Sequence, residues 1–281
     1  MKIGLVLAGG GVKGAAHIGV IKALEENNIK IDAIGGTSIG SIVASLYALG
    51  YNPEETLKLF KYFSKNIIKA NPKYNLSSIR QSKKIMGYGV LSGENIELVM
   101  DECAKYKDKT DINELELPIV IPTVDIIESK KYVFTNNEEE KDYYIKNISI
   151  GKAVRASCSY PGVYAPCTYK KHKFVDGGVM DNVPVQEVKD LGVDKIITVK
   201  FSSSLNYNPK NVYEVVSKSI DIIFDSREQA AVEASDYLID LDLSEAAVFN
   251  INKIDYCYNI GYINTITNIR KINKALGIKN K

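Results

Sequence analysis

The sequence predicts an α/β protein of three layers, in which a mostly parallel central sheet is flanked by helices. A continuous apolar run over residues 3–8 has the length of a strand buried on both faces, and glycines and a helical apolar spacing over 15–28 follow it. The same order then repeats, with a short apolar run over 31–34, a glycine turn and a helical pattern over 41–49. Strand, glycine turn and helix in succession are typical of parallel strands joined by crossover helices.

The rest of the chain contains no internal repeat and no low-complexity linker. We therefore expect a single domain over residues 1–281, with its motifs within 3–200 and a C-terminal helical part over 201–281. A helix is predicted at 254–276, ending at Gly277. Further strands are predicted at 118–125, 131–134, 174–175, 195–200 and 237–241.

Composition excludes several classes of protein. The 281 residues are 45% hydrophobic and 25% charged, which is average for globular proteins and unlike a disordered chain or a coiled coil. Lys and Arg number 36 against 34 Asp and Glu, so the overall charge gives no support to a nucleic-acid partner. No apolar run is long enough to predict a transmembrane helix. The N-terminal apolar run is shorter than a signal peptide requires, so we interpret it as a strand and expect a cytoplasmic protein.

The sequence does not predict a metal centre. It contains two histidines, and its four cysteines lie far apart without a C-x-x-C pair: Cys103, Cys158, Cys167 and Cys257. A zinc site of ordinary ligand spacing is therefore not expected.

A glycine-rich loop, Gly9-Gly10-Gly11-Val12-Lys13-Gly14, follows the first predicted strand and opens a helix. Its spacing matches the G-x-G-x-x-G loop of dinucleotide-binding proteins, so a nucleotide-binding module is one hypothesis. That hypothesis needs an acid at the end of the second strand, whereas Asp32 precedes the apolar residues of this strand, and Ala15 stands where a P-loop has its lysine. What remains is a loop of backbone N–H groups at a helix N-terminus, which attracts negative charge such as a developing oxyanion.

The second motif, Gly36-Thr37-Ser38-Ile39-Gly40, has the G-x-S-x-G pattern between a strand and a helix. This is the context of a nucleophile elbow, in which glycines allow the strained turn that exposes the serine hydroxyl. An ordinary glycine turn in which the serine caps the helix is the alternative. Because parallel strands end at the same edge of a sheet, the glycine loop and the serine are expected to lie close together.

A nucleophilic serine needs a base, and the chain offers few. His172 precedes Asp176 by four residues on a predicted strand, which separates them by about 13 Å, so they cannot pair with each other. His17 aligns with the apolar face of its helix, and we interpret it as a packing residue. No histidine follows residue 172, which excludes the Ser-Asp-His order of the α/β hydrolases.

The third motif, Phe174-Val175-Asp176-Gly177-Gly178, offers a carboxylate instead. An aspartate at a strand end, followed by two glycines, could reach a serine in a neighbouring loop. A carboxylate is a weak base, so direct Ser–Asp chemistry needs a dry site. An ordinary turn is the alternative, and Asp181 competes for the role of base.

In this order, GGGVKG, GTSIG and DGG resemble the signature of the patatin-like phospholipase family, and HIGVIKAL, ASCSYPGVYAP and NVPV around them agree. The resemblance covers residues 3 to about 200 and is closest to the short bacterial members related to neuropathy target esterase. It implies a patatin-like fold and a serine acyl hydrolase that cleaves lipid esters (phospholipid, lysophospholipid or glyceride) through a covalent acyl-enzyme, with no metal or organic cofactor. An acyltransferase with the same residues is the alternative.

The resemblance also implies roles for individual residues. Ser38 would be the nucleophile, and Asp176 would be its only catalytic partner in a Ser–Asp dyad. The backbone N–H groups of Gly9, Gly10 and Gly11 would form the oxyanion hole. The positions that support these motifs are Lys13, Gly14, Gly36, Gly40, Gly177 and Gly178.

Residues 56–93 differ from the rest of the chain in composition. No acid occurs between Glu55 and Glu94, while eight Lys and Arg residues and several aromatic residues do. Such a stretch could lie on an anionic membrane surface, where each basic residue adds about 1 kcal/mol. A solvated helix and loop at the domain edge is the alternative. The expected partners are therefore a lipid or small ester and, on the first hypothesis, a membrane surface that the protein contacts peripherally.

Overall fold

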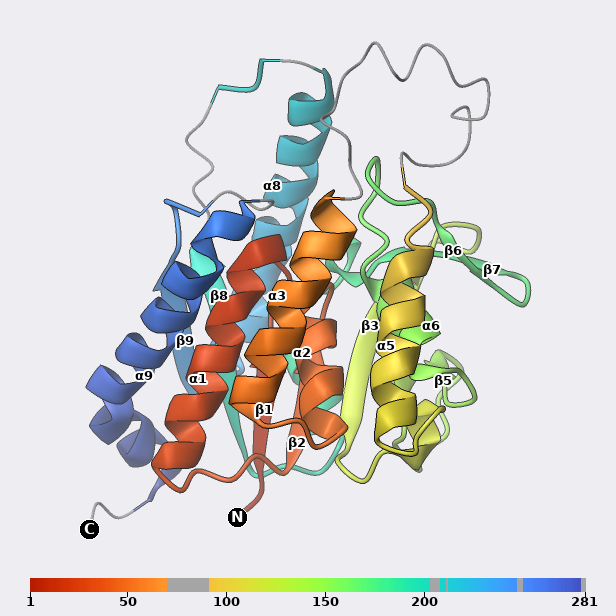
Figure 1. Ribbon diagram of the computed structural model, residues 1–281. Coiled ribbons are helices and arrows are strands. Elements are labelled where there is room, and N and C mark those ends of the chain that lie inside the picture. Colours follow the sequence, from red (N-terminus) through yellow and green to blue (C-terminus); the bar gives the residue numbers. More distant parts are fainter. Residues whose placement is uncertain (70–90, 203–207, 211, 247–249, 279–281) are drawn as a thin grey trace.

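Figure 1 shows the computed structural model, which describes residues 1–69, 91–202, 208–210, 212–246 and 250–278. The strands of this part are β1 (Ile3–Leu7), β2 (Ala33–Gly36), β3 (Ile119–Asp125), β4 (Lys130–Thr135), β5 (Tyr144–Ile145), β6 (Cys167–Tyr169), β7 (His172–Asp176), β8 (Lys195–Ser202) and β9 (Tyr237–Asp242). They form one sheet in the order β5-β4-β3-β2-β1-β8-β9, to which β7 is added beside β3, and β6 beside β7. The central neighbours β3, β2, β1, β8 and β9 are all parallel, whereas β4 and β7 pair antiparallel with β3.

Helices cover both faces of the sheet. The helices are α1 (Ala15–Glu26), α2 (Ile39–Ala48), α3 (Pro53–Lys69), α5 (Glu94–Tyr106), α6 (Ile150–Ser157), α7 (Val185–Lys189), α8 (Val212–Glu233) and α9 (Ile254–Leu276). The first helix packs between α3 and α9 in front of the sheet, and α8 lies behind (Figure 1). In the described part of the chain, no helix combines the length and apolarity that crossing a membrane requires.

The first strand shows why its sequence is a continuous apolar run. Leu5 and Leu7 join a large core with the helices in front, while Val6 and Ala8 join a second core with Val188 of α7 behind. All four side chains are buried. Burial on both faces removes the polar alternation that a half-exposed strand would show.

The third strand changes neighbours along its length, and this change positions the site. Its first residues pair with β2, where Val120 lies opposite Gly35. Its last residues pair with β7, where Thr123 lies opposite Asp176. The second strand ends at Gly36. Beyond this end, β7 pairs with the same edge of β3 that β2 occupies earlier. Asp176 is thereby brought to the loop that follows β2.

The predicted fold class is confirmed, and the expected strands and helices occur with small shifts in their bounds. The largest shift concerns the second strand, predicted at 31–34 and found at Ala33–Gly36. Asp32 lies just before this strand, where its N–H donates to the Ile3 oxygen (2.8 Å) and its carboxylate accepts from the Ile3 N–H (3.0 Å). The helix α8 falls within the predicted C-terminal helical part, whereas α5, α6, α7 and the short strands β5 and β6 were not predicted.

Candidate active site

The second strand runs into α2 through a tight turn centred on Ser38. Ser38 has φ 53° and ψ −125°, a strained conformation for a residue with a side chain. Gly36 and Gly40 make room for the turn, since a Cβ at either would lie 2.3 Å from a backbone oxygen, that of Gly40 and that of Leu7 respectively. The geometry is that of a nucleophile elbow at the N-terminus of a helix.

Hydrogen bonds from three elements hold this strained turn. The Ser38 N–H donates to Ser157 Oγ at the end of α6 (3.0 Å), and the Ser38 oxygen accepts from the Ser41 hydroxyl (2.6 Å). The Thr37 hydroxyl donates to the backbone oxygen of Asp181 (2.9 Å), which ties the turn to the loop after β7. The sequence analysis did not assign a role to Ser157, although it lies within the segment ASCSYPGVYAP.

Asp176, the last residue of β7, is fully buried beside Ser38. Its Oδ1 accepts the Gly178 N–H (2.9 Å), and its own N–H donates to the Ser159 oxygen (3.0 Å). Burial raises the pKa of Asp176 from 3.8 to about 7, against the opposing effects of the Ser38 hydroxyl and the Gly178 N–H. Oδ2 makes no well-aligned hydrogen bond to a described residue, and catalytic hydrogen bonds often align only when substrate binds. The carboxyl group can therefore exchange a proton near neutral pH.

The glycine loop at the end of β1 lies against Ser38. A Cβ on Gly9 would lie only 3.1 Å from Ser38 Cβ, so the glycine loop packs tightly against the serine. The Gly9 N–H donates to Asn182 Oδ1 (3.0 Å), so this N–H is engaged and, unlike in the sequence-based expectation, is not offered to an oxyanion. Gly10 and Gly11 stand at the start of the 3-10 turn η1 (Gly11–Gly14), where N–H groups have no intrahelical acceptor. The N–H groups of Gly10 and Gly11 therefore have no intrahelical acceptor and are candidates for binding an oxyanion.

Three further motif glycines allow close packing around the site. A Cβ on Gly14 would lie 2.6 Å from the side chain of Ile39, the residue after the serine. A Cβ on Gly177 would lie 2.3 Å from a backbone oxygen of β3, and one on Gly178 would lie 2.4 Å from the Phe224 ring of α8. The two glycines after Asp176 thus let both β3 and α8 press against the turn that holds the carboxylate.

The remaining residues of the glycine loop do not form a nucleotide site. Asp32 lies at the amino end of β2, at the opposite edge of the sheet from the glycine loop, so it cannot bind a ribose there. Lys13 is buried and interacts electrostatically with Asp242 of β9 and Cys257 of α9. This lysine links the glycine loop to the C-terminal part of the chain.

Two other candidate bases are engaged elsewhere. The Asp181 carboxylate accepts from the ammonium of Lys131 (2.8 Å), which also pairs with Glu187. His17 is fully buried, and its Nε2 lies 2.8 Å from the Ala8 oxygen. Burial lowers the pKa of His17 to about 4, so its imidazole is neutral at ordinary pH. The structure agrees with the interpretation of His17 as a packing residue.

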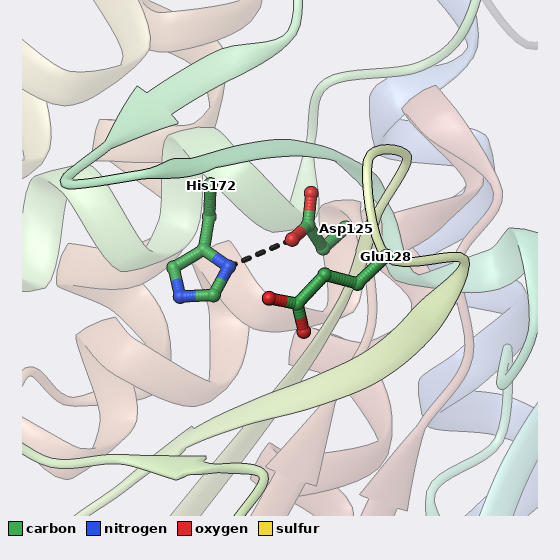
Figure 2. Close-up of side chains that lie close together, drawn as sticks. All are labelled: Asp125, Glu128 and His172. Atoms are coloured by element: carbon green, nitrogen blue, oxygen red, sulfur yellow. Dashed lines mark hydrogen bonds and ion pairs between the residues drawn. The ribbon is translucent and has the colours of Figure 1, made fainter.

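His172 joins a cluster that the sequence analysis missed. Figure 2 shows His172, Asp125 and Glu128 turned toward one another, with His172 Nδ1 2.7 Å from Asp125 Oδ2. Both Glu128 oxygens are also engaged, one by the Tyr132 hydroxyl (2.6 Å) and the other by the Lys171 ammonium (3.2 Å). Because an ammonium group beside the cluster opposes a second cation, we interpret it as a brace between the β3–β4 turn and the start of β7, not as a metal site.

Sequence comparison relates the chain to known proteins. A protein-family sequence model described as "Patatin-like phospholipase" matches residues 5–189 of the chain. Lysophospholipase NTE1 of Meyerozyma guilliermondii is 34% identical over 215 residues, and that of Candida albicans is 33% identical over 215 residues. Each match covers 76% of this chain but 14% of the relative, so the chain spans a small part of these curated relatives.

Solved structures with a similar fold include VipD from Legionella pneumophila and human GIVD cytosolic phospholipase A2. VipD has a TM-score of 0.54 at 15% identity, over 96% of this chain and 67% of that chain. The human enzyme has a TM-score of 0.54 at 11% identity, over 98% of this chain and 60% of that chain. At these identities the likeness concerns the fold.

Proposed function

The chain belongs to the patatin-like phospholipase family, and from that membership we propose that it hydrolyses carboxylic esters of lipids through Ser38 and Asp176, within a single domain. The observation that carries the proposal is the strained Ser38 turn beside a buried carboxyl group whose pKa is raised to about 7. A carboxylate of ordinary pKa would be a poor base, whereas one near neutrality has the proton affinity that general-base catalysis needs.

The proposed reaction proceeds in two steps. Ser38 Oγ attacks the ester carbonyl while Asp176 accepts its proton, and the N–H groups of Gly10 and Gly11 bind the oxyanion. One such donor is worth about 3 kcal/mol in comparable sites. Asp176 then gives the proton to the leaving alcohol, and an acyl-enzyme remains on Ser38. Water, deprotonated by Asp176, attacks the acyl carbonyl. The bond to Ser38 Oγ breaks as Asp176 returns the proton to this oxygen, which releases the fatty acid and regenerates the serine.

The substrate is proposed from the curated relatives, whose names specify lysophospholipase. The test offers lysophosphatidylcholine, phosphatidylcholine, monoacylglycerol and a p-nitrophenyl ester in parallel, and it measures released fatty acid by mass spectrometry. We expect fatty acid release from at least one lipid, with the monoacyl phospholipid turned over fastest. Release from no ester would contradict the hydrolase proposal. Formation of a new ester at the expense of fatty acid, when glycerol is added as acceptor, would favour the acyltransferase alternative.

The proposal extends to peripheral contact with a lipid surface through residues 56–93. Lys58 and Lys65 are exposed on α3, while Lys61 pairs with Asp255 (2.5 Å). The span also includes residues 70–90, which lie outside the described residues.

We predict that Lys58→Gln combined with Lys65→Gln weakens binding to anionic vesicles several-fold, because each basic side chain near such a surface contributes to attraction. Flotation with phosphatidylcholine–phosphatidylserine vesicles measures the effect. The control is Lys30→Gln, a lysine before β2 whose side chain is 85% exposed, and each α3 substitution is also measured singly against it. If the extent of vesicle binding changes neither with salt concentration nor in the Lys58→Gln, Lys65→Gln variant, this part of the proposal is contradicted.

A further inference from the structure

A buried amide, Asn182, links the glycine loop to α8. Asn182 lies in the loop after β7 and is 8% exposed. Its Oδ1 accepts the Gly9 N–H (3.0 Å), and its Nδ2 donates to Glu228 Oε1 (2.6 Å). Because the backbone N–H can only donate and an ionised carboxylate can only accept, both bonds fix the orientation of the same amide.

Glu228 is itself held in place. It is 5% exposed on α8, and its Oε2 lies 3.6 Å from the ammonium of Lys200 on β8. A carboxylate oxygen paired with a lysine is a strong acceptor for an amide N–H. The position of Asn182 is therefore set from α8 and β8, not from its own loop alone.

One face of α8 contacts both halves of the candidate site. Phe224 and Glu228 are four residues apart and so lie on the same face of the helix. Phe224 packs against Gly178, next to Asp176, while Glu228 reaches the glycine loop through Asn182. The base and the loop of N–H donors are thus placed relative to each other by the same helix.

Only Gly9, of the three loop glycines, has its N–H bonded to this amide. A Cβ on Gly9 would lie 2.5 Å from Asn182 Oδ1, so the loop and the amide are in close contact. Holding the Gly9 peptide anchors the start of the loop from which the Gly10 and Gly11 N–H groups project. Errors of about 1 Å in such placement cost on the order of 100-fold in rate.

We propose that Asn182, held by Glu228, is a positioning residue that orients the glycine loop so that the Gly10 and Gly11 N–H groups meet the oxyanion. The inference rests on the proposed ester hydrolysis. An interaction that aligns donors for the oxyanion acts in the transition state, so its loss lowers kcat and leaves KM nearly unchanged.

The test exchanges the hydrogen-bond donor and acceptor between Asn182 and Glu228. Asn182→Asp keeps an acceptor for Gly9 but places a second carboxylate against Glu228. We expect kcat to fall about 10- to 100-fold, which is less than the roughly 100- to 1,000-fold cost of removing an oxyanion donor outright. In Asn182→Asp with Glu228→Gln, the new amide can donate to the new carboxylate, and we expect kcat within about threefold of wild type. The kcat values are measured with a p-nitrophenyl ester and divided by the fraction of sites that a fluorophosphonate titrates.

This titration separates positioning from folding, because unfolded protein contributes no titrated sites. The pH midpoint of turnover should stay unchanged in all variants, since Asp176 is not touched. The inference is wrong if Asn182→Asp retains the wild-type kcat per titrated site, or if the double substitution is no better than the single one. Failure of the proposed function looks different, because wild-type protein would then neither turn over the ester nor be titrated.

Discussion

Ser38→Ala should lower ester turnover by at least about 10⁴-fold while the protein remains folded. The Ser38 hydroxyl is the proposed attacking group, and loss of a nucleophilic serine removes the covalent route altogether. Alanine keeps the Cβ that already occupies the strained backbone conformation, so the turn should persist. Turnover of a p-nitrophenyl ester measures the loss, and thermal unfolding verifies the fold.

Ser45→Ala is the matched control for this substitution. Ser45 lies on the same helix, is buried, and its hydroxyl has no hydrogen-bond partner among the described residues. We expect wild-type turnover from this variant. Equal turnover by Ser38→Ala and Ser45→Ala would contradict the role of Ser38.

Asp176→Asn should lower turnover on the order of 10⁴-fold, because the amide cannot accept the serine proton. Asparagine has nearly the same shape and keeps an oxygen for the Gly178 N–H. In the wild-type protein, kcat/KM should rise about tenfold per pH unit below about pH 7 and level off above it, since only ionised Asp176 is a base.

The matched control is Asp181→Asn, which removes the other carboxylate of this loop and its bond to Lys131. Its pH midpoint should stay near 7. A midpoint that moves in Asp181→Asn, together with retained turnover in Asp176→Asn, would reassign the base.

Asp176→Asn has a second expected consequence, which concerns stability. Folding raises the pKa of Asp176 above its ordinary value of 3.8, so the folded state holds the proton more tightly than the unfolded state. Protonated Asp176 therefore makes its whole contribution to the free energy of unfolding below about pH 4. This contribution is lost as the pH rises through about 7. The difference between these limits is about 4 kcal/mol.

Asp176→Asn, which carries no charge at either pH, should thus be more stable than wild type at about pH 8, and this advantage should shrink toward pH 4. Urea unfolding at the two pH values measures it. Equal stability differences at both pH values would mean that burial does not raise this pKa.

Local chemistry explains how much of the site was predictable. The turn around Ser38 needs glycines at 36 and 40 because their Cβ atoms would strike backbone oxygens, and this requirement is visible in the sequence as G-x-S-x-G. The apolar run of β1 likewise predicts a strand buried on both faces, which the two cores confirm.

Contacts between distant segments were not predictable in the same way. The Gly9–Asn182 hydrogen bond joins residues 173 positions apart. The residues on either side of Asn182 do not indicate that its side chain pairs with Gly9. His172 pairs with Asp125 because β7 lies antiparallel to β3, a pairing that no spacing in the sequence specifies. The glycine pattern therefore predicted the turn around Ser38, while the contacts of Asn182 and His172 emerged only from the packing of the sheet.

Covalent labelling tests the central claim most directly. Wild-type protein is treated with an alkyl fluorophosphonate, digested, and mapped by tandem mass spectrometry. We predict one adduct, on Ser38, which forms more slowly below about pH 7 as Asp176 is protonated and does not form in Ser38→Ala. An adduct on another residue, or labelling of Ser38→Ala at the wild-type rate, would contradict the assignment of Ser38 as the nucleophile.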